Sequence, residues 1–117
     1  MTENSFKQKH SFEDRVSESS RVLTNYPDRI PIICEKSKQN DLPTIDKNKY
    51  LVPRDLTIGQ FIYVIRKRIC LQPEEALFLF VSNRMVSTNS IMNEVYNLYK
   101  DNDGFLYIQY AKENTFG

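Results

Sequence analysis

The chain has 117 residues, enough for one domain that buries its own hydrophobic core. Its composition, 40% hydrophobic and 26% charged, is that of an ordinary soluble globular protein, and its sequence has no apolar run near the ~20 residues of a membrane-spanning helix. The formal net charge of +1 argues against a dedicated nucleic-acid-binding protein, because that class is usually strongly basic.

The first nine residues lack the apolar segment of a secretory signal, so we expect a protein of the cytoplasm or nucleus. Two cysteines, Cys34 and Cys70, are too few for a disulfide framework or a zinc cluster, and we interpret both as buried reduced thiols. A catalytic Cys–His pair would need His10, the only histidine, and nothing local supports it. We expect no enzymatic activity, no cofactor and no metal site.

The charges are unevenly distributed. Residues 30–70 carry eight basic and four acidic side chains, whereas residues 71–117 carry three basic and six acidic ones. A basic middle part favours partners with acidic flanks. Solvated surface charge accounts for the same pattern equally well.

The N-terminal part has helical signals. Residues 6–10 suit a short helical turn, and Ser11 with an acidic residue three positions later is a capping signal. Apolar residues then recur at nearly helical spacing until Pro27, which cannot continue a helix. These recurring residues are Phe12, Val16, Leu23 and Tyr26, and they support an N-terminal helical segment.

Two strands and a helix follow. Residues 30–35 are β-branched and apolar, which predicts a strand, and the polar residues 36–48 fit a long hairpin connection. Residues 50–53 predict a short strand whose Pro53 lacks an N–H, as at an edge or a strand end. Thr57 and Gln60 form a capping-box pattern before a helix. Its buried stripe is predicted to contain Ile58, Phe61, Ile62, Ile65 and Ile69. A strand edge beside such a helix forms a groove that suits an extended peptide.

The last third predicts strand, helix and strand. Residues 77–81 are continuously apolar, as in a strand covered on both faces, and residues 82–85 suit a turn. Ser87 or Thr88 is expected to cap a second helix. Its inner side is predicted to carry Ile91, Met92, Val95, Tyr96 and Tyr99. A turn at 101–104 and a strand at 105–110 follow, and residues 111–117, without periodicity, are expected to be mobile.

This order predicts an α+β fold of the β-grasp type, as in ubiquitin, with a four-stranded mixed sheet and two helices. Periodicity alone does not fix the strand order. We divide the chain into an N-terminal helical extension (1–28), a ubiquitin-like domain (29–110) and a C-terminal tail (111–117).

Six segments together resemble the autophagy ubiquitin-like modifiers, the GABARAP and microtubule-associated-protein light-chain group. They are Tyr26–Pro31, Lys49–Pro53, Thr57–Phe61, Ile65–Ile69, Asp103–Tyr107 and Glu113–Gly117. The resemblance extends from about residue 6 to Gly117 and implies a ubiquitin core preceded by two helices. Two departures are Val64, commonly leucine in relatives, and the loop 83–87, which lacks the proline usual there.

The resemblance implies a lipid-conjugated modifier. In this family an E1-like activating enzyme adenylates the terminal glycine, here Gly117, and an E2-like conjugating enzyme helps to join it to phosphatidylethanolamine. A cysteine protease processes and delipidates family members. The protein is then expected in the cytoplasm, on autophagosomal membranes when lipidated, and in the vacuole or lysosome on delivery. On the autophagosomal membrane it is expected to recruit receptors that carry an aromatic-x-x-aliphatic motif.

The resemblance also implies three binding surfaces. The first peptide pocket maps to Glu18, Val22, Pro31, Lys49, Leu51 and Phe105. The second maps to Tyr50, Val52, Pro53, Leu56, Phe61, Val64 and Arg68. A second docking surface maps to Phe78, Leu79, Phe80 and Val81. Leu56, Phe61, Phe80 and Phe105 also suit a hydrophobic core, and we expect them to serve both purposes.

Two other functions remain open. An unconjugated ubiquitin-like adaptor would bind peptide motifs or cytoskeletal proteins through the same groove, so only the fate of Gly117 separates it from a modifier. Nucleic-acid binding through residues 66–68 would give a steep salt dependence of affinity, but the near-neutral net charge argues against it.

Overall fold

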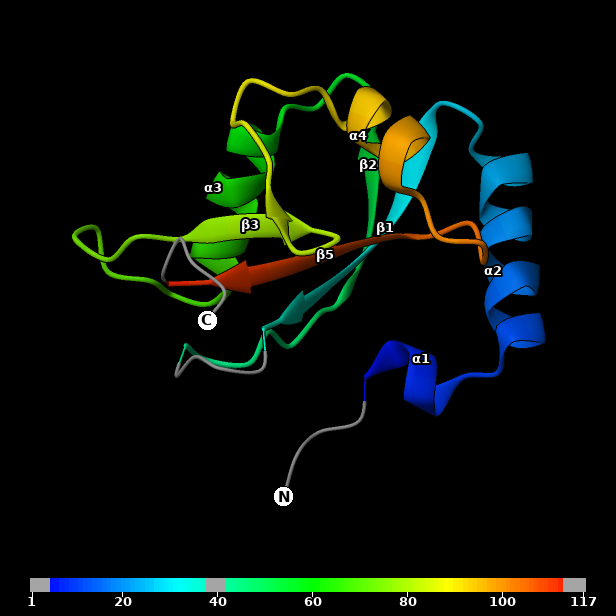
Figure 1. The fold of residues 1–117 in the computed structure, drawn as a ribbon, viewed down its shortest axis with the longest axis horizontal. Helices are drawn as coiled ribbons and strands as arrows, with labels where there is room; N and C mark the ends of the chain where they lie inside the picture. Colours follow the sequence, from blue (N-terminus) through cyan, green and yellow to red (C-terminus); the bar gives the residue numbers. More distant parts are fainter. Residues whose placement is uncertain (1–4, 38–41, 113–117) are drawn as a thin grey trace.

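The computed structural model describes residues 5–37 and 42–112. Along the chain come two helices, two strands, a helix, two strands, a helix and a final strand (Figure 1). The helices are α1 (Phe6–Lys9), α2 (Phe12–Asn25), α3 (Ile58–Arg68) and α4 (Met92–Tyr99). The strands are β1 (Arg29–Lys36), β2 (Lys49–Pro53), β3 (Phe78–Val81), β4 (Arg84–Met85) and β5 (Leu106–Ala111).

The strands form one mixed sheet in the order β2-β1-β5-β3-β4. β1 and β5 are parallel neighbours at its centre, and the other pairs are antiparallel. The predicted α+β ubiquitin-like fold is thereby confirmed, and the two N-terminal helices precede it in the chain.

The sheet has one strand more than we predicted. The turn expected at 82–85 contains only Ser82 and Asn83, because Arg84 and Met85 pair with β3 as strand β4. Both turn residues have positive φ, 51° and 62°, as a tight two-residue hairpin of type I′ requires.

The two faces of the sheet have different coverings. Ile30, Ile32 and Cys34 of β1 belong to the larger core cluster, which includes the buried residues of α3 and α4. Ile33 points to the opposite face and packs with Phe6 and Phe105. Because side chains alternate along a strand, β1 contributes to both layers, and the N-terminal helices lie on the side away from α3 (Figure 1).

Helix α3 has the predicted start and inner face. The Thr57 hydroxyl accepts a hydrogen bond from the Gln60 backbone N–H at 3.1 Å, and the Gln60 side chain accepts one from the Thr57 N–H at 2.9 Å. The side chains on the predicted stripe are buried, except that of Ile62, which is half-buried. The capping box and the apolar spacing were sufficient to predict this helix.

Helix α2 begins as predicted, and the side chains that it buries are polar. The Ser11 side chain accepts from the Asp14 N–H at 3.1 Å. Of the recurring apolar residues, Val16 and Leu23 are half-buried, whereas Phe12 and Tyr26 are about half exposed. The residues of α2 that are buried are Arg15 and Ser19. The reason is that α2 packs on the polar loop 101–104, where hydrogen bonds replace apolar contacts.

Helix α4 begins later than predicted, and neither Ser87 nor Thr88 caps it. Its N-cap is Ile91, 38% exposed and without a capping side chain. The backbone carbonyls of Arg54 and Leu56 instead accept from the first amides of α4, at 2.9 and 2.7 Å. The backbone after β2 thus satisfies the N–H donors that a Ser or Thr cap would have satisfied. The inner side chains Met92, Val95 and Tyr96 are buried, and Tyr99 packs against the core.

Three smaller expectations also need correction. Cys34 is fully buried as predicted, but Cys70 is exposed, in a left-handed conformation (φ 55°) at the end of α3. The connection 36–48, predicted to be polar, also contributes two apolar side chains to the core, because Leu42 and Ile45 are buried. Ala111 is the last residue of β5 rather than part of the tail, whereas residues 113–117 lie outside the described part. No helix among the described residues is long and apolar enough to cross a membrane.

Candidate peptide-binding groove

Strand β2 lies at an edge of the sheet. It pairs with β1 on one side, and among residues 5–37 and 42–112 no strand pairs with its other side. Pro53 ends the strand and is exposed. The backbone N–H and C=O groups along this free side of β2 suit the addition of an extended peptide.

The first predicted pocket gathers on the side of the sheet that α2 covers. The Lys49 ammonium lies 2.8 Å from the Glu18 carboxylate and 5.9 Å from the centre of the Phe6 ring. Across the strands, Leu51 is the register partner of Pro31, so their side chains share a face. Strand β2 and helix α2 together bring these predicted residues to one place.

The remaining first-pocket residues are less exposed. Phe105 is 2% exposed and meets the Phe6 ring edge-on at 5.3 Å between ring centres. Val22 is half-buried and lies one helical turn after Glu18, on the same face of α2. Phe105 therefore belongs to the core, and a ligand that uses it would meet it at the floor of the pocket.

The second predicted pocket lies on the α3 side of β2. Tyr50 and Val52 point there, opposite to Lys49 and Leu51, because alternate residues of a strand face opposite sides. The Tyr50 ring meets the Phe61 ring edge-on at 5.4 Å between centres. Tyr50, Val52 and Phe61 are buried, and Leu56 packs against them.

Tyr50 contributes a buried polar group to this side. Its hydroxyl has no hydrogen-bond partner among the described residues. Burial, with a smaller contribution from the neighbouring Cys34, raises the pKa of Tyr50 to about 12. The hydroxyl therefore stays protonated at neutral pH and keeps its capacity to donate.

The outer rim of the second pocket is formed by α3. Val64 is 39% exposed, and it lines a shallow surface depression with Tyr63, Lys67 and Arg68. The Arg68 guanidinium lies 3.2 Å from the Asp46 carboxylate, and both side chains are well exposed. Pro53 is the exception in this predicted set, since strand alternation turns it toward the face of Lys49.

The predicted second docking surface coincides with β3. Leu79, Phe80 and Val81 are each 2% exposed, and Phe78 is half-buried. β3 pairs with β5 on one side and with β4 on the other. Most of this surface is thus part of the core, and Phe78 is its most exposed side chain.

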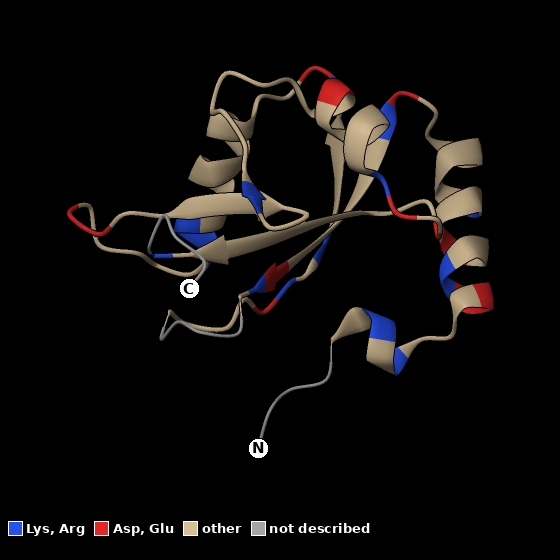
Figure 2. Ribbon diagram, viewed as in Figure 1, with Lys and Arg blue, Asp and Glu red and all other residues tan. Residues whose placement is uncertain are grey.

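Several basic residues of the middle part have partners inside the protein. The Arg66 guanidinium donates to the carbonyl oxygens of Gln72 and Glu75 at 2.9 and 2.6 Å, which holds the loop after α3. Arg54 donates to the Pro27 carbonyl at 2.9 Å and to the Asn93 side chain at 2.7 Å. Figure 2 shows the basic residues spread over several elements rather than gathered into one patch.

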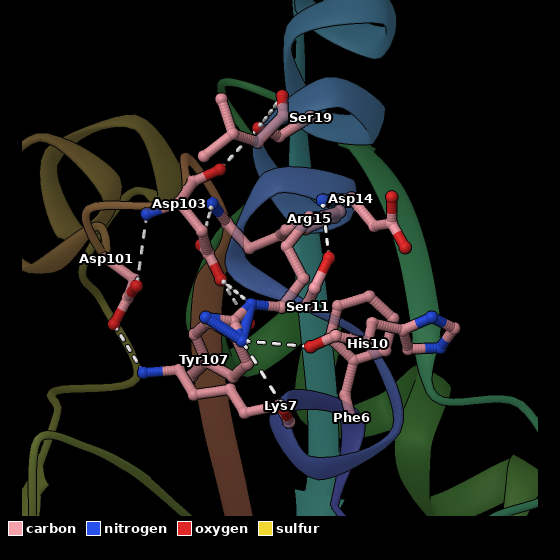
Figure 3. Close-up of polar contacts among 12 residues, drawn as sticks. Phe6, Lys7, His10, Ser11, Asp14, Arg15, Ser19, Asp101, Asp103 and Tyr107 are labelled. Carbon is pink, nitrogen blue, oxygen red and sulfur yellow. Dashed lines mark hydrogen bonds and ion pairs between the residues drawn. The ribbon is translucent and has the colours of Figure 1, made fainter.

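One buried polar cluster, centred on Asp103, was not predicted from the sequence. Asp103, whose side chain is fully buried, forms an ion pair with Arg15 at 3.1 Å and accepts a hydrogen bond from Tyr107 at 2.5 Å (Figure 3). Burial and this hydrogen bond raise the pKa of Tyr107 well above its usual range. The only signal in the sequence was Asp103 within a family-like segment, since its partner Arg15 lies far away in the chain.

The described residues offer little for other chemistry. No group of three or more His, Cys, Asp or Glu side chains among them suits a metal ion. Burial raises the pKa of the Cys34 thiol, which keeps it protonated and a poor nucleophile. His10 packs on Phe6, on the opposite face of the sheet from Cys34. Gly117 lies outside the described residues.

Comparison with known proteins gives a consistent result. A sequence profile of the family described as "Autophagy protein Atg8 ubiquitin like" matches residues 14–117. The Autophagy-related protein 8 of Mycosarcoma maydis is 58% identical over 114 residues, and that of Candida glabrata is 55% identical over 114 residues. Each alignment covers 97% of this chain and 97% of the relative.

A solved structure agrees with these sequence matches. The crystal structure of Trypanosoma brucei ATG8 is similar with a TM-score of 0.90 and 45% sequence identity. The match covers 99% of this chain and 100% of that one. With a family profile over most of its length, relatives of nearly equal length and the same fold, the chain belongs to the Atg8 family of ubiquitin-like autophagy proteins.

Proposed function

We propose that the chain is a modifier joined through Gly117 to phosphatidylethanolamine, and that the groove along β2 captures receptors with an aromatic-x-x-aliphatic motif. Both proposals specify the role in autophagy that membership of the Atg8 family gives the chain. The observation that carries the groove proposal is the edge position of β2 between two covered faces.

The spacing of the motif fits this geometry. Two residues three positions apart in an extended strand point to opposite faces, since side chains alternate. A peptide paired with the free side of β2 would direct its aromatic residue to the side of Lys49 and Leu51. Its aliphatic residue would then reach the α3 side, near Val64. One added strand therefore fills both pockets without bending.

The charges at the rim favour acidic peptide flanks. Lys49 is half exposed next to the first pocket, and Arg68 is exposed next to the second. Each already has an acidic partner within the chain, Glu18 for Lys49 and Asp46 for Arg68. A peptide carboxylate would therefore compete with these partners for a positive charge that they already hold in position. Such rim contacts increase the association rate and selectivity more than the affinity.

The conjugation proposal rests on family membership and on the glycine at position 117. A glycine has no side chain to obstruct a narrow enzyme channel or the approach of a nucleophile. An E1-like activating enzyme, an E2-like conjugating enzyme and a delipidating cysteine protease would act on this chain, which would itself be a substrate and not a catalyst. The lipid would move it from the cytoplasm to autophagosomal membranes and on to the vacuole or lysosome.

Calorimetric titration with a Trp-x-x-Leu peptide tests the groove. We expect Leu51→Ala to weaken binding by about tenfold, as truncation of a central contact typically does. Leu98→Ala is the matched control, because Leu98 is 75% exposed on α4, outside the groove. Equal affinities of the wild type and Leu51→Ala, or wild-type binding that persists when both peptide anchors are alanine, would contradict the proposal.

The second candidate is an unconjugated adaptor, which would use the same groove. The features of β2, α2 and α3 support both functions equally. The adaptor would remain soluble in the presence of the conjugating enzymes and lipid, whereas the modifier would become membrane-bound through Gly117.

A further inference from the structure

The loop 101–104 holds helix α2 against the sheet through one buried residue. Asp103 has a fully buried side chain, and its carboxylate accepts hydrogen bonds from the Phe105 N–H at 2.9 Å and from the Tyr107 hydroxyl at 2.5 Å. The Arg15 Nε lies 3.1 Å from the same carboxylate as an ion pair and makes no hydrogen bond among the described residues. Its backbone carbonyl accepts from the Ser19 hydroxyl at 2.5 Å. Figure 3 shows Arg15 and Ser19 of α2 and Tyr107 of β5 converging on Asp103.

Gly104 allows this close approach. Its φ of +93° is a conformation that residues with side chains rarely adopt, and a Cβ there would lie 2.4 Å from the Ser19 hydroxyl oxygen. Only the short Ser19 side chain therefore lies between helix α2 and the loop backbone.

These contacts adjoin the first pocket at two points. Ser19 directly follows Glu18, which pairs with Lys49 of β2. Phe105, on the pocket floor, is two residues after Asp103 and donates its N–H to that carboxylate. A shift of α2 relative to the loop would therefore move Glu18 away from Lys49 and widen the pocket over Phe105.

We infer that Asp103 is a positioning residue that sets the width of the first pocket and thereby the preference of the groove for an aromatic anchor. This inference rests on the proposed peptide-binding function for the identity of the ligand. Asp103 lies beneath the pocket and acts through α2 and Phe105.

The negative charge of Asp103 is the critical property. Arg15 is only 10% exposed, and its other contacts are longer hydrogen bonds to the carbonyls of Lys7 and His10, at 3.4 and 3.3 Å. Asp103→Asn keeps the shape of the side chain but removes the carboxylate that pairs directly with the Arg15 guanidinium. The Asp101 carboxylate, which also interacts with the Arg15 charge, is paired with Lys7. A buried charge that loses its partner drives rearrangement toward water, which for Arg15 requires α2 to move outward.

The experiment compares two peptides on the full chain by calorimetric titration. One carries Trp-x-x-Leu, and the other carries Ala-x-x-Leu and binds through the second pocket alone. We expect Asp103→Asn to lower the affinity for the Trp peptide by about tenfold, which is the size of a lost anchor contact. The affinity for the Ala peptide should fall by less than about twofold. Asp55→Asn, an exposed carboxylate in the turn after β2, is the matched control and should change neither.

Tyr107→Phe keeps the experiment decisive if Asp103→Asn does not fold. It removes only the hydroxyl that donates to Asp103 and should shift selectivity in the same direction by a smaller factor. An equal loss of affinity for both peptides would indicate a general structural role and overturn the inference. Unchanged affinity for the Trp peptide in both variants would overturn it as well.

Amide hydrogen exchange without peptide separates the two proposals. We expect Asp103→Asn to accelerate exchange in α2 while the amides of α3 keep their wild-type rates. If wild-type protein binds neither peptide, the groove proposal fails and the selectivity claim with it. The exchange rates of α2 would still decide whether Asp103 holds the helix, and unchanged rates would refute that too.

Discussion

Asp101, in the loop that follows α4, forms a partly exposed ion pair with Lys7 of α1. Its carboxylate lies 2.6 Å from the Lys7 ammonium and also accepts from the Asp103 N–H at 3.1 Å. Partial burial alone would raise the pKa of Asp101, but the hydrogen bonds from Lys7 and Asp103, with the charges of Lys7 and Arg15, lower it overall.

This lowered pKa predicts a specific acid dependence. Because the folded pKa lies below the unfolded one, the Asp101 carboxylate stabilises the fold above about pH 4 and loses that effect as the pH falls through the folded pKa. In urea unfolding at a series of pH values, the wild type should lose free energy of unfolding more steeply below about pH 4 than Asp101→Asn does. Parallel curves for the two proteins would contradict this.

Gly104 gives a second prediction at the scale of one residue. Gly104→Ala places a Cβ 2.4 Å from the Ser19 oxygen at a φ of +93°, so it should lower the free energy of unfolding by roughly 1–3 kcal/mol. Gly59→Ala is the control, because its φ is ordinary and better helix propensity offsets a tight 3.3 Å contact with Thr88, within about 1 kcal/mol. Chemical denaturation measures the free energy of unfolding of both variants. A larger loss for Gly59→Ala than for Gly104→Ala would show that Gly104 is not the more constrained glycine.

Single residues were predictable where their role is local. Ser11 and Thr57 cap helices in a pattern contained within four residues, and both caps were predicted. Arg15 and Asp103 were not, because burial of either charge depends on the other, far away in the chain. A charged residue with no visible partner is expected to be exposed.

At the scale of elements, the two helices of the core differ in what starts them. α3 depends on the Thr57 side chain, whereas backbone carbonyls serve the first amides of α4. Thr57→Ala should therefore lower the free energy of unfolding by about 1 kcal/mol, and Thr88→Ala should change it by only a few tenths. Thermal and urea unfolding of the two variants measure this, and equal losses would show that the caps are wrongly assigned.

Most elements were predictable from apolar spacing or local capping and turn signals, but strand β4 and the exact start of α4 were not. α3 and the strands β1, β3 and β5 follow from spacing and β-branched content. β4 has two residues, too few for any period, and forms only because the Ser82–Asn83 turn returns the chain beside β3. The start of α4 depends on Leu56 and Arg54, which the local sequence does not reveal.

At the scale of the whole molecule, the central parallel pair β1–β5 brings the two ends of the fold together. Strand order could not be derived from periodicity, since pairing between distant segments leaves no local pattern. The family resemblance implied a ubiquitin core preceded by two helices. The same resemblance proposed the pocket residues, and the structure gathers Glu18, Lys49, Pro31 and Leu51 beside α2. Their role in peptide binding stays a prediction.

The most direct measurement of the central claim is intact mass after incubation with the E1-like and E2-like enzymes, ATP and liposomes that contain phosphatidylethanolamine. Amide formation between the Gly117 carboxyl and the lipid amine releases one water. Wild-type protein should therefore gain the mass of one lipid less one water, and Gly117→Ala should gain nothing. No gain on the wild type, with enzymes that are active on another modifier, would contradict conjugation and leave the soluble adaptor.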